Sequence, residues 1–295
     1  MLNKISRKIF NIYKPKLTKK RKVYCSPDNT KNKYTCFSLD SLKKIAKKWN
    51  KNNKDKIRMS KSIPTLWKNI RKKMNNNNEW CWIQQNFIKE LNDDKINSTF
   101  RPQIPNEWYL NKNEWLSTID IEDVMKQYED KHKDFQFVGP VPIDFDLKDS
   151  VGDCIIDELC KIDIFNLKKQ KIVKIGIIFN LDKHDQNGSH WVALYSDLNK
   201  NNIYYFDSYG LGPPQEIDTL AQRLVSQGNK NNTKINYKKN NNRFQFKGSE
   251  CGVYCMYFIT ELLKGKSFTK IKNNIIKDDE MMENRGYFYS PNCSI

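Results

Sequence analysis

Residues 245–256 read QFKGSECGVYCM, in which a cysteine followed by glycine stands directly before an apolar run of helical length. The glycine and serine ahead of the cysteine favour a turn, and the apolar spacing after it predicts a helix over 251–264. Cys251 would then lie at the helix start, where the helix dipole favours a thiolate. Cys255, one turn later, is predicted to be a packing residue. By itself, a cysteine at a helix start can equally be a small core residue.

Two strand-like runs ahead of this stretch supply a candidate base and a group to orient it. His190 opens the β-rich run 190–198, and Asp207 lies near the end of the next run, 202–210, after a short turn. Antiparallel pairing would bring the start of the first run beside the end of the second, so we expect His190 and Asp207 to be neighbours. A carboxylate in that place would fix the tautomer of the imidazole. Taken separately, the histidine could be a partly exposed turn residue and the aspartate a turn former.

Gln245 ends a predicted strand over 233–246, six residues before Cys251. Its side-chain amide could donate a hydrogen bond to the oxyanion of a tetrahedral intermediate, together with the backbone N–H of Cys251. One such donor typically stabilises the transition state by roughly 3–4 kcal/mol. The alternative is a solvated glutamine at a strand end.

Taken together, these residues resemble the ubiquitin-like-protein protease family, which includes the SUMO proteases and the adenovirus maturation protease. The shared pattern is a His-Trp pair at 190–191, Asp207 seventeen residues after the histidine, and Gln245 followed by Cys251-Gly252. The order His–Asp–Cys is the order of that family. The resemblance covers about residues 104–295.

By this resemblance the chain has an α+β, papain-like cysteine protease scaffold with a central mixed sheet flanked by helices. The implied activity is hydrolysis after Gly-Gly-type sequences by a thiol protease that requires no metal or organic cofactor. Trp191 and Trp115 would flank a channel that admits only glycine before the scissile bond. Trp115 and Leu116 also match the family element Trp-Leu-x-Asp-x-x-Ile, although Thr118 stands where an acidic residue is usual. An ordinary core role for both tryptophans remains open.

The pattern of helices and strands predicts three regions. They are a basic flexible arm over 1–37, a small helical domain over 38–98, and the catalytic domain over 99–295. The helical domain combines three candidates, which begin at Asp40 or Ser41, at Pro64 or Thr65, and at Glu79.

In the catalytic region the sheet and the helices are partly segregated along the sequence, which also favours an α+β fold. The predicted elements are a helix over 114–132 that buries Ile119, Ile121, Val124, Met125 and Tyr128, β-rich runs over 171–180, 190–198 and 202–210, a helix over 216–227, the strand 233–246 and the helix 251–264.

Composition limits the class of protein. The chain has 295 residues, and no apolar run approaches the roughly 18–20 residues that cross a bilayer. We therefore predict a soluble protein without a membrane span or secretory signal. Its eight cysteines form no CxxC pair, and its three histidines have no zinc-finger spacing. A disulfide framework is not expected in so long a chain, which predicts reduced thiols in a cytosol-like compartment.

Basic charge is concentrated in the first quarter of the sequence. Residues 1–75 carry 24 Lys and Arg against three Asp, whereas the rest of the chain carries 28 basic and 31 acidic residues. One hypothesis is sequence-independent, salt-sensitive binding of nucleic acid through residues 1–75. The alternatives are a solubilising tail or an arm that docks on an acidic protein.

The Asn- and Lys-rich composition and the distinct N-terminal module are similar to the virion maturation proteases of large nucleocytoplasmic DNA viruses. That reading predicts a monomer that cuts viral structural polyproteins at Gly-Gly-Xaa sites, in the virion and at the assembly site in the host cytoplasm. The alternatives are a deconjugating protease for SUMO- or ubiquitin-like proteins, an acyltransferase on the same scaffold, and a non-enzymatic DNA-binding virion protein with a decayed protease domain. The presence of all four candidate catalytic residues argues against decay.

Overall fold

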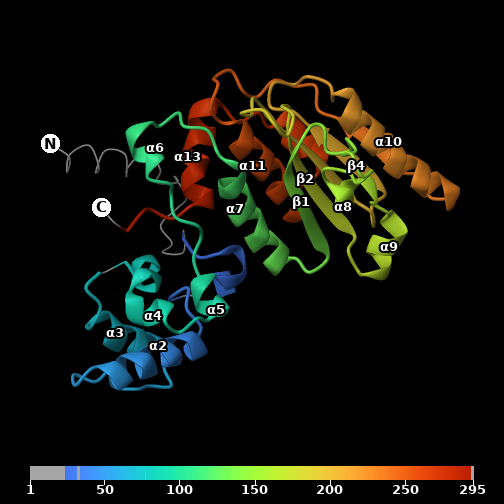
Figure 1. Cartoon of the computed structure of the whole chain (residues 1–295). Coiled ribbons are helices and arrows are strands. Elements are labelled where there is room, and N and C mark those ends of the chain that lie inside the picture. Colours follow the sequence, from blue (N-terminus) through green and yellow to red (C-terminus); the bar gives the residue numbers. More distant parts are fainter. Residues whose placement is uncertain (1–23, 32–33, 77, 294–295) are drawn as a thin grey trace. The chain divides into compact units, whose positions relative to one another are not determined.

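The computed structural model divides the chain into two compact units (Figure 1). It describes residues 24–31, 34–76 and 78–293. The first unit contains the chain up to residue 112 and the stretch from 283 onward, and the second contains residues 113–282. The division thus differs from the predicted one in two ways: it comes after residue 112 instead of residue 98, and the C-terminal stretch belongs to the first unit.

Backbone pairing and aromatic packing bring the C-terminal stretch into the first unit. The backbone N–H of Ser290 donates to the carbonyl of Pro102 at 2.7 Å, and that of Ile104 donates to Ser290 at 2.8 Å. The rings of Trp108 and Tyr289 meet at a centroid distance of 5.0 Å. Contacts between segments so far apart in the sequence leave no local pattern, which is why the sequence did not indicate them.

Short helices build the first unit. They are η1 (Pro27–Lys31), α2 (Leu39–Asn52), α3 (Ile63–Arg71), η2 (Glu79–Gln84), α4 (Asn86–Lys89), α5 (Asp94–Asn97) and α6 (Glu107–Leu110). Ser38, and not the predicted Asp40 or Ser41, caps α2, because its hydroxyl accepts the N–H of Ser41 at 3.0 Å. The buried face of α2 follows the predicted helical spacing, with Leu42 and Ile45 fully enclosed.

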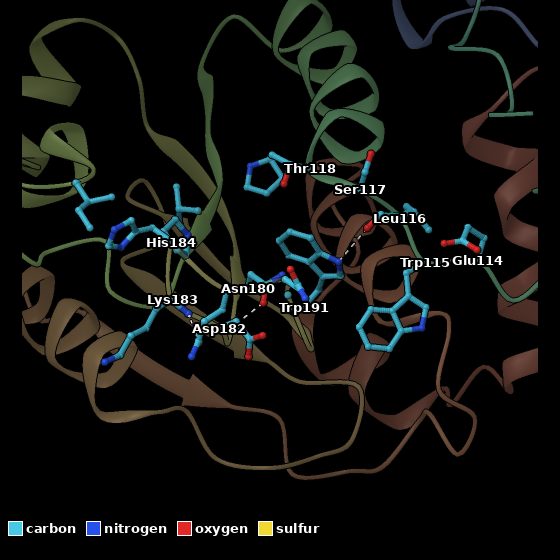
Figure 2. A pocket seen from close by; sticks show the side chains of 17 residues that line it. Glu114, Trp115, Leu116, Ser117, Thr118, Asn180, Asp182, Lys183, His184 and Trp191 are labelled. Carbon is cyan, nitrogen blue, oxygen red and sulfur yellow. Dashed lines mark hydrogen bonds between the residues drawn. The ribbon is translucent and has the colours of Figure 1, made fainter. Parts of the chain in front are cut away.

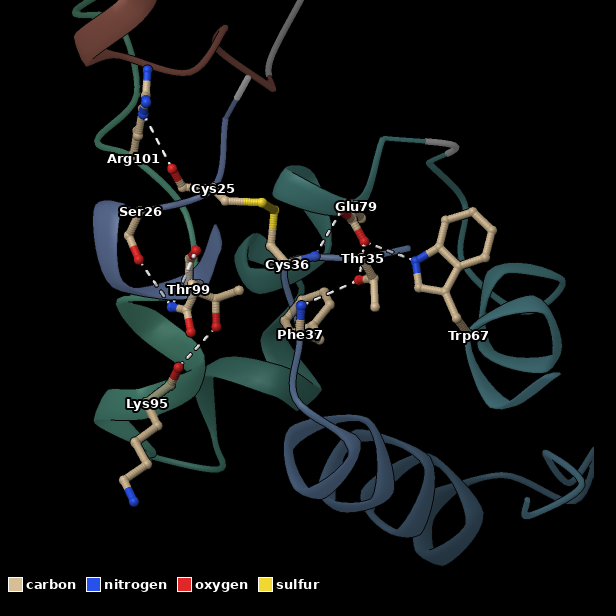
Figure 3. The surroundings of a disulfide bond; sticks show 11 residues. Cys25, Ser26, Thr35, Cys36, Phe37, Trp67, Glu79, Lys95, Thr99 and Arg101 are labelled. Atoms are coloured by element: carbon tan, nitrogen blue, oxygen red, sulfur yellow. Dashed lines mark hydrogen bonds between the residues drawn. A yellow bond between two sulfur atoms is a disulfide. The ribbon is translucent and has the colours of Figure 1, made fainter. Parts of the chain in front are cut away.

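Part of the predicted flexible arm is folded. Cys25 and Cys36 form a disulfide, and Cys25 and Phe37 are completely buried in the core of the first unit (Figure 3). The prediction of a flexible arm is therefore wrong for residues 24–31 and 34–37, whereas residues 1–23 of that arm lie outside the described residues. The arm was predicted from its basic composition. Composition does not show which cysteine and aromatic side chains come into contact in the folded chain.

Three disulfides replace the reduced thiols that we expected. They join Cys25 to Cys36, Cys81 to Cys293, and Cys154 to Cys160, while Cys251 and Cys255 are free. The expectation was wrong because it was based on chain length and the lack of a spacing signature. Disulfide formation depends instead on whether two Cα atoms come within roughly 4.4–6.8 Å.

A five-stranded mixed sheet forms the centre of the second unit and confirms the predicted α+β class. Its strands lie in chain order: β1 (Phe135–Pro142), β2 (Lys174–Asn180), β3 (Trp191–Asp197), β4 (Asn202–Phe206) and β5 (Asn236–Lys239). The pairs β2–β3 and β3–β4 are antiparallel, whereas β1–β2 and β4–β5 are parallel. The sequence analysis missed β1, and it predicted a longer β5.

Helices cover both faces of this sheet (Figure 1). The helices after residue 112 are α7 (Thr118–Lys131), α8 (Asp157–Cys160), α9 (Ile164–Lys169), α10 (Gln215–Lys230), α11 (Cys251–Leu263), α12 (Phe268–Asn273) and α13 (Asp278–Phe288), within which the unit boundary falls. Apolar residues of α8, α9 and α10 share one core with the strand residues of one face, such as Ile177 and Leu194. On the other face α11 approaches so closely that a Cβ on Gly176 would lie 3.1 Å from Ile259. Among the described helices, none is both long and apolar enough to cross a membrane.

Candidate active site

Cys251 is the first residue of α11, as the sequence predicted. The helix begins there because the backbone turns at Glu250, whose carbonyl accepts the N–H of Tyr254 at 2.9 Å. The Cys251 side chain is only 2% exposed, and its position at the helix N-terminus places it in the region where the dipole favours negative charge. Burial raises the pKa of the Cys255 thiol well above its usual value, so Cys255 is a neutral packing residue.

His190 and Asp207 lie together at one end of the sheet. His190 directly precedes β3 and Asp207 directly follows β4, and these two strands pair with Ala193 opposite Phe206. The register brings His190 Nε2 to 2.6 Å from Asp207 Oδ1. This hydrogen bond occupies Nε2 and leaves Nδ1 as the ring nitrogen available to the Cys251 side chain.

The surroundings of His190 keep it protonated at neutral pH. Burial, the strongest single influence, lowers its pKa, but the hydrogen bonds and charges of Asp207 and Cys251 together outweigh burial. The result is that the pKa of His190 is raised to about 9. An imidazolium held between a carboxylate and a sulfur is the arrangement that favours a thiolate nucleophile.

Asp207 also accepts hydrogen bonds from the backbone of the loop that follows it. Its Oδ1 accepts the backbone N–H of Tyr209 at 2.9 Å and its Oδ2 accepts that of Leu211 at 3.1 Å. The Tyr209 ring stacks on His190 with a centroid distance of 4.5 Å and an interplanar angle of 18°. One carboxylate thus fixes both the imidazole and the loop that covers it. The sequence analysis missed Tyr209, although its place two residues after Asp207 could have indicated it.

Gln245 is completely buried beside this group. Its Oε1 accepts the hydroxyl of Ser208 at 2.6 Å, and its Nε2 donates to the carbonyl of Lys247 at 2.6 Å. A side-chain amide carries two N–H hydrogens, and the bond to Lys247 engages one of them. Ser208, which the sequence analysis also missed, therefore determines which end of the amide is the donor.

Both predicted tryptophans line a cleft of about 630 Å³ (Figure 2). Trp191 is buried and donates its indole N–H to the carbonyl of Leu116 at 3.2 Å, whereas Trp115 is 44% exposed. Gly252, which directly follows Cys251, packs against two residues of this cleft, because a Cβ at Gly252 would lie 3.3 Å from both Leu116 and Trp191. Cys251 therefore stands next to the Trp191 wall of the cleft.

Helix α7 places Trp115 and Leu116 at this cleft. The helix starts later than predicted, because Ser117 and Asp120 form a capping box at its N-terminus. Trp115 and Leu116 consequently lie ahead of the helix. Ile119, predicted to be buried, is 68% exposed because, at 3.6 residues per turn, it lies on the side of the helix opposite the buried Ile121, Val124, Met125 and Tyr128. The unusual Thr118 is simply the first helical residue.

Comparison with known proteins assigns this arrangement to a family. The sequence profile of the Ulp1 protease family, C-terminal catalytic domain, matches residues 166–289. A protein described as a thiol protease of Acanthamoeba polyphaga mimivirus is 33% identical over 294 residues, which cover 90% of this chain and 92% of the relative. The chain belongs to the Ulp1 protease family. It is therefore a cysteine protease, as the resemblance implied.

Relatives of this protease also occur in African swine fever virus. A SUMO-1 cysteine protease of that virus is 31% identical over 117 residues, which cover 39% of the present protease and 43% of the relative. The crystal structure of an African swine fever virus protease superposes with a TM-score of 0.62 at 21% identity, over 91% of this chain and 96% of the other. At that identity the superposition shows a shared fold.

Proposed function

We propose that the protease cleaves peptide bonds after Gly-Gly-type sequences, with Cys251 as the nucleophile. The observation that carries this proposal is that Gly252, the residue after Cys251, packs against Trp191, a wall of the tryptophan-lined cleft. Trp191 and Trp115 both line that cleft, and Gly252 packs on Trp191 immediately after Cys251. A substrate with glycine before the scissile bond has no side chain to clash with such walls.

The mechanism follows from the protonation of His190. The Cys251 thiolate attacks the carbonyl carbon of the glycine, and the imidazolium of His190 gives its proton to the amine that leaves as the C–N bond breaks. The neutral imidazole then takes a proton from water, and the resulting hydroxide attacks the thioester and releases the carboxylate product. Asp207 holds the ring in place through Nε2 in both steps.

The oxyanion requires donors that are fixed before the reaction begins. The backbone N–H of Cys251 at the helix start is one, and the second amide hydrogen of Gln245 is the other that we propose. Replacing Gln245 with alanine removes one donor and is expected to lower kcat about 10²–10³-fold. Gln245→Glu, which keeps the size but removes the N–H, should show a similar loss.

An activity probe tests the cleavage site directly. A peptide that ends in Gly-Gly with an electrophile at its C-terminus should label the wild-type protein and Cys255→Ala, but not Cys251→Ala. Changing the last glycine of the probe to alanine should reduce the labelling rate at least about 10²-fold. Labelling that persists in Cys251→Ala would show that another residue is the nucleophile.

We further propose that the substrates are viral structural polyproteins, cut in the virion or at the cytoplasmic assembly site. The viral origin of relatives such as the mimivirus protease supports this. Incubating virion core proteins with wild-type protease and mapping the new N-termini should show Gly-Gly before each cut, and none with Cys251→Ala. Cuts at other sequences would contradict the proposal.

Deconjugation is the second candidate, because a relative from African swine fever virus is described as a SUMO-1 cysteine protease. Deconjugation and polyprotein processing differ in how much of the substrate the enzyme must bind: a folded SUMO-like domain or only the peptide around the cut. A deconjugating protease should cleave a SUMO fusion at least about 10²-fold faster than a six-residue peptide with the same Gly-Gly junction. A polyprotein-processing protease should cleave both at similar rates.

The first unit presents a basic surface that supports nucleic-acid binding as an additional function. Between residues 38 and 75 there are 13 Lys and Arg against Asp40 and Asp55. Lys43, Lys47 and Lys51 recur every four residues along α2, and within the described residues none of the three forms an ion pair. Such a lysine row fits the phosphates of a nucleic acid backbone.

A salt series on the full-length protein tests this surface. Replacing Lys43, Lys47 and Lys51 with alanine should reduce the slope of log K against log salt by about 2–3, since each lost phosphate contact removes about one. Lys126→Ala, which removes a lysine paired with Glu122 in α7, is the matched control. Affinity that does not depend on salt would remove the hypothesis.

A further inference from the structure

A cation stands beside the catalytic histidine. The guanidinium of Arg243 lies over the ring of Tyr209 at 5.5 Å from its centroid, and Tyr209 in turn stacks on His190. The guanidinium of Arg243 also lies over the ring of Phe246, 4.8 Å from its centroid. We call Tyr209, Arg243 and Phe246 the leaving-side rim.

The rim holds Arg243 in a defined position. Its Nε donates to the carbonyl of Gln245 at 2.9 Å, so the guanidinium is fixed by one hydrogen bond and two aromatic rings. Asp278 anchors the backbone beneath Phe246, whose N–H reaches Asp278 Oδ2 at 3.0 Å. An arginine fixed in this way loses little rotational freedom when it binds a carboxylate.

Arg243 forms no ion pair with any residue in the part of the chain that the structure describes. Two acidic residues that contact this loop are already engaged: Asp278 of α13 accepts backbone N–H groups of Phe246 and Lys247, and Asp279 pairs with Lys247 at 2.5 Å. The side chain of Phe246 is 68% exposed. The rim therefore presents a positive charge without a partner next to an exposed apolar ring.

The rim flanks His190 and is separate from the cleft. Tyr209 stacks on His190, whereas Leu116 and Trp191 of the cleft meet Gly252, the residue after Cys251 (Figure 2 shows the cleft). None of the three rim residues lines the cleft. If the glycine end of a substrate occupies the cleft, a segment that continues past Cys251 and His190 comes to the rim, at about 3.3 Å per residue.

We propose that the leaving-side rim selects substrates with a carboxylate in the first two residues after the scissile bond. Arg243 binds that carboxylate through its Nη hydrogens, and Phe246 packs against the aliphatic part of the same segment. The inference rests on the proposed cleavage function, because it assumes that the cleft takes the glycine side.

Two substrates that differ in one group test the rim. Both carry the same sequence through Gly-Gly, followed by Glu-Glu in one and Gln-Gln in the other. For each protein variant the ratio of the two kcat/KM values is measured, so the fraction of active enzyme cancels. The wild type should favour the Glu substrate about 10-fold at low salt, and Arg243→Gln should bring the ratio close to one.

Further variants separate recognition from general damage. Arg243→Lys keeps the charge without the planar fork and should retain part of the preference, whereas Arg243→Glu should invert it. Lys239→Gln makes the same change of charge at a lysine that pairs with Asp218, and the wild-type ratio should persist. A ratio near one in the wild type, or an unchanged ratio in Arg243→Gln, would overturn the inference.

The Gly-Gly probe distinguishes failure of the rim from failure of the proposed function, because the probe has no segment after the electrophile. If the wild type labels but shows no substrate preference, the rim alone is wrong. If the wild type does not label, the Gly-Gly function is wrong, and the inference about the rim is overturned with it.

Discussion

His190 and Asp207 meet across the ends of two neighbouring antiparallel strands, with Nε2 and Oδ1 2.6 Å apart. Seventeen residues separate them in sequence, yet the hairpin register alone makes them neighbours. Since the pKa of His190 is raised to about 9, we expect this pair to make both the activity and the stability of the protease fall as pH rises through that value.

The pH profile of kcat/KM should fall on the alkaline side with an apparent pKa of about 9, as His190 loses its proton. Asp207→Asn should move this limb toward the ordinary histidine value of about 6.5 and lower kcat about 10²-fold. His184 and Asp144 form a second pair at 2.8 Å, and Asp144→Asn is the control that should leave the limb near 9. If the alkaline limb of Asp207→Asn has the same apparent pKa as that of the wild type, the assignment of this pKa to His190 paired with Asp207 is wrong.

The same protonation contributes to folding. A folded pKa above the unfolded value of about 6.5 gives stability that is fully present below that pH and is lost as pH rises through about 9. The free energy of unfolding of His190→Gln, measured by denaturant titration between pH 6 and 10, should therefore decline less on the alkaline side than that of the wild type. Parallel curves would argue against the raised pKa.

Gly252→Ala should damage the site without touching a catalytic group. The added Cβ would lie 3.3 Å from Leu116, Trp191 and Ile121, so the tryptophan wall must shift. We expect a loss of about 1–3 kcal/mol in stability and a lower rate of Gly-Gly probe labelling. Gly212→Ala, where a Cβ meets nothing within 4 Å, is the control and should change neither.

Glu79 should be a key residue of the first unit. Its carboxylate accepts the indole N–H of Trp67 at 2.8 Å, the backbone N–H of Cys36 at 3.2 Å and the hydroxyl of Thr35 (Figure 3). Glu79→Ala leaves three donors without a partner and should cost about 3–5 kcal/mol in denaturant unfolding. Glu90→Ala removes only an exposed ion pair with Lys48 and should cost at most about 1 kcal/mol.

Alkylation should discriminate among the eight cysteines. Iodoacetamide applied to the native, unreduced protein should modify Cys251 alone, because the protonated His190 interacts with Cys251, whereas burial raises the pKa of Cys255 and the other six cysteines are paired. Denaturation without reductant should expose Cys255 and bring the count to two. Modification of Cys81 or Cys293 under either condition would show that this disulfide is absent.

The elements that could be predicted from the sequence are those formed by residues close together in the chain. The hairpin formed by β3 and β4 and the helix that begins at Cys251 are each contained in a short stretch, so their patterns placed His190, Asp207 and Cys251 correctly at the ends of elements. Strand β1 was missed because FQFVGPVP contains a glycine and two prolines, which break a strand pattern, and because its partner β2 lies far along the chain.

Other features could not be predicted because they arise only in three dimensions. The bond from Ser208 that orients Gln245 spans 37 residues, and the disulfide between Cys81 and Cys293 spans 212. The capping box at Ser117 sets where α7 begins, and the spacing of the buried Ile121, Val124, Met125 and Tyr128 leaves Ile119 on the opposite, exposed side of the helix. The local sequence pattern does not identify contact partners that lie so far apart along the chain.

The pairing of Ser290 with Pro102 and the disulfide between Cys81 and Cys293 determine the order in which the two units can be completed during translation. The first unit lacks the segment from residue 283 onward until the ribosome has translated it, whereas the second unit, 113–282, is already synthesised by then. A stop codon introduced between residues 283 and 290 would therefore damage the first unit while leaving His190, Asp207, Gln245 and Cys251 in the chain.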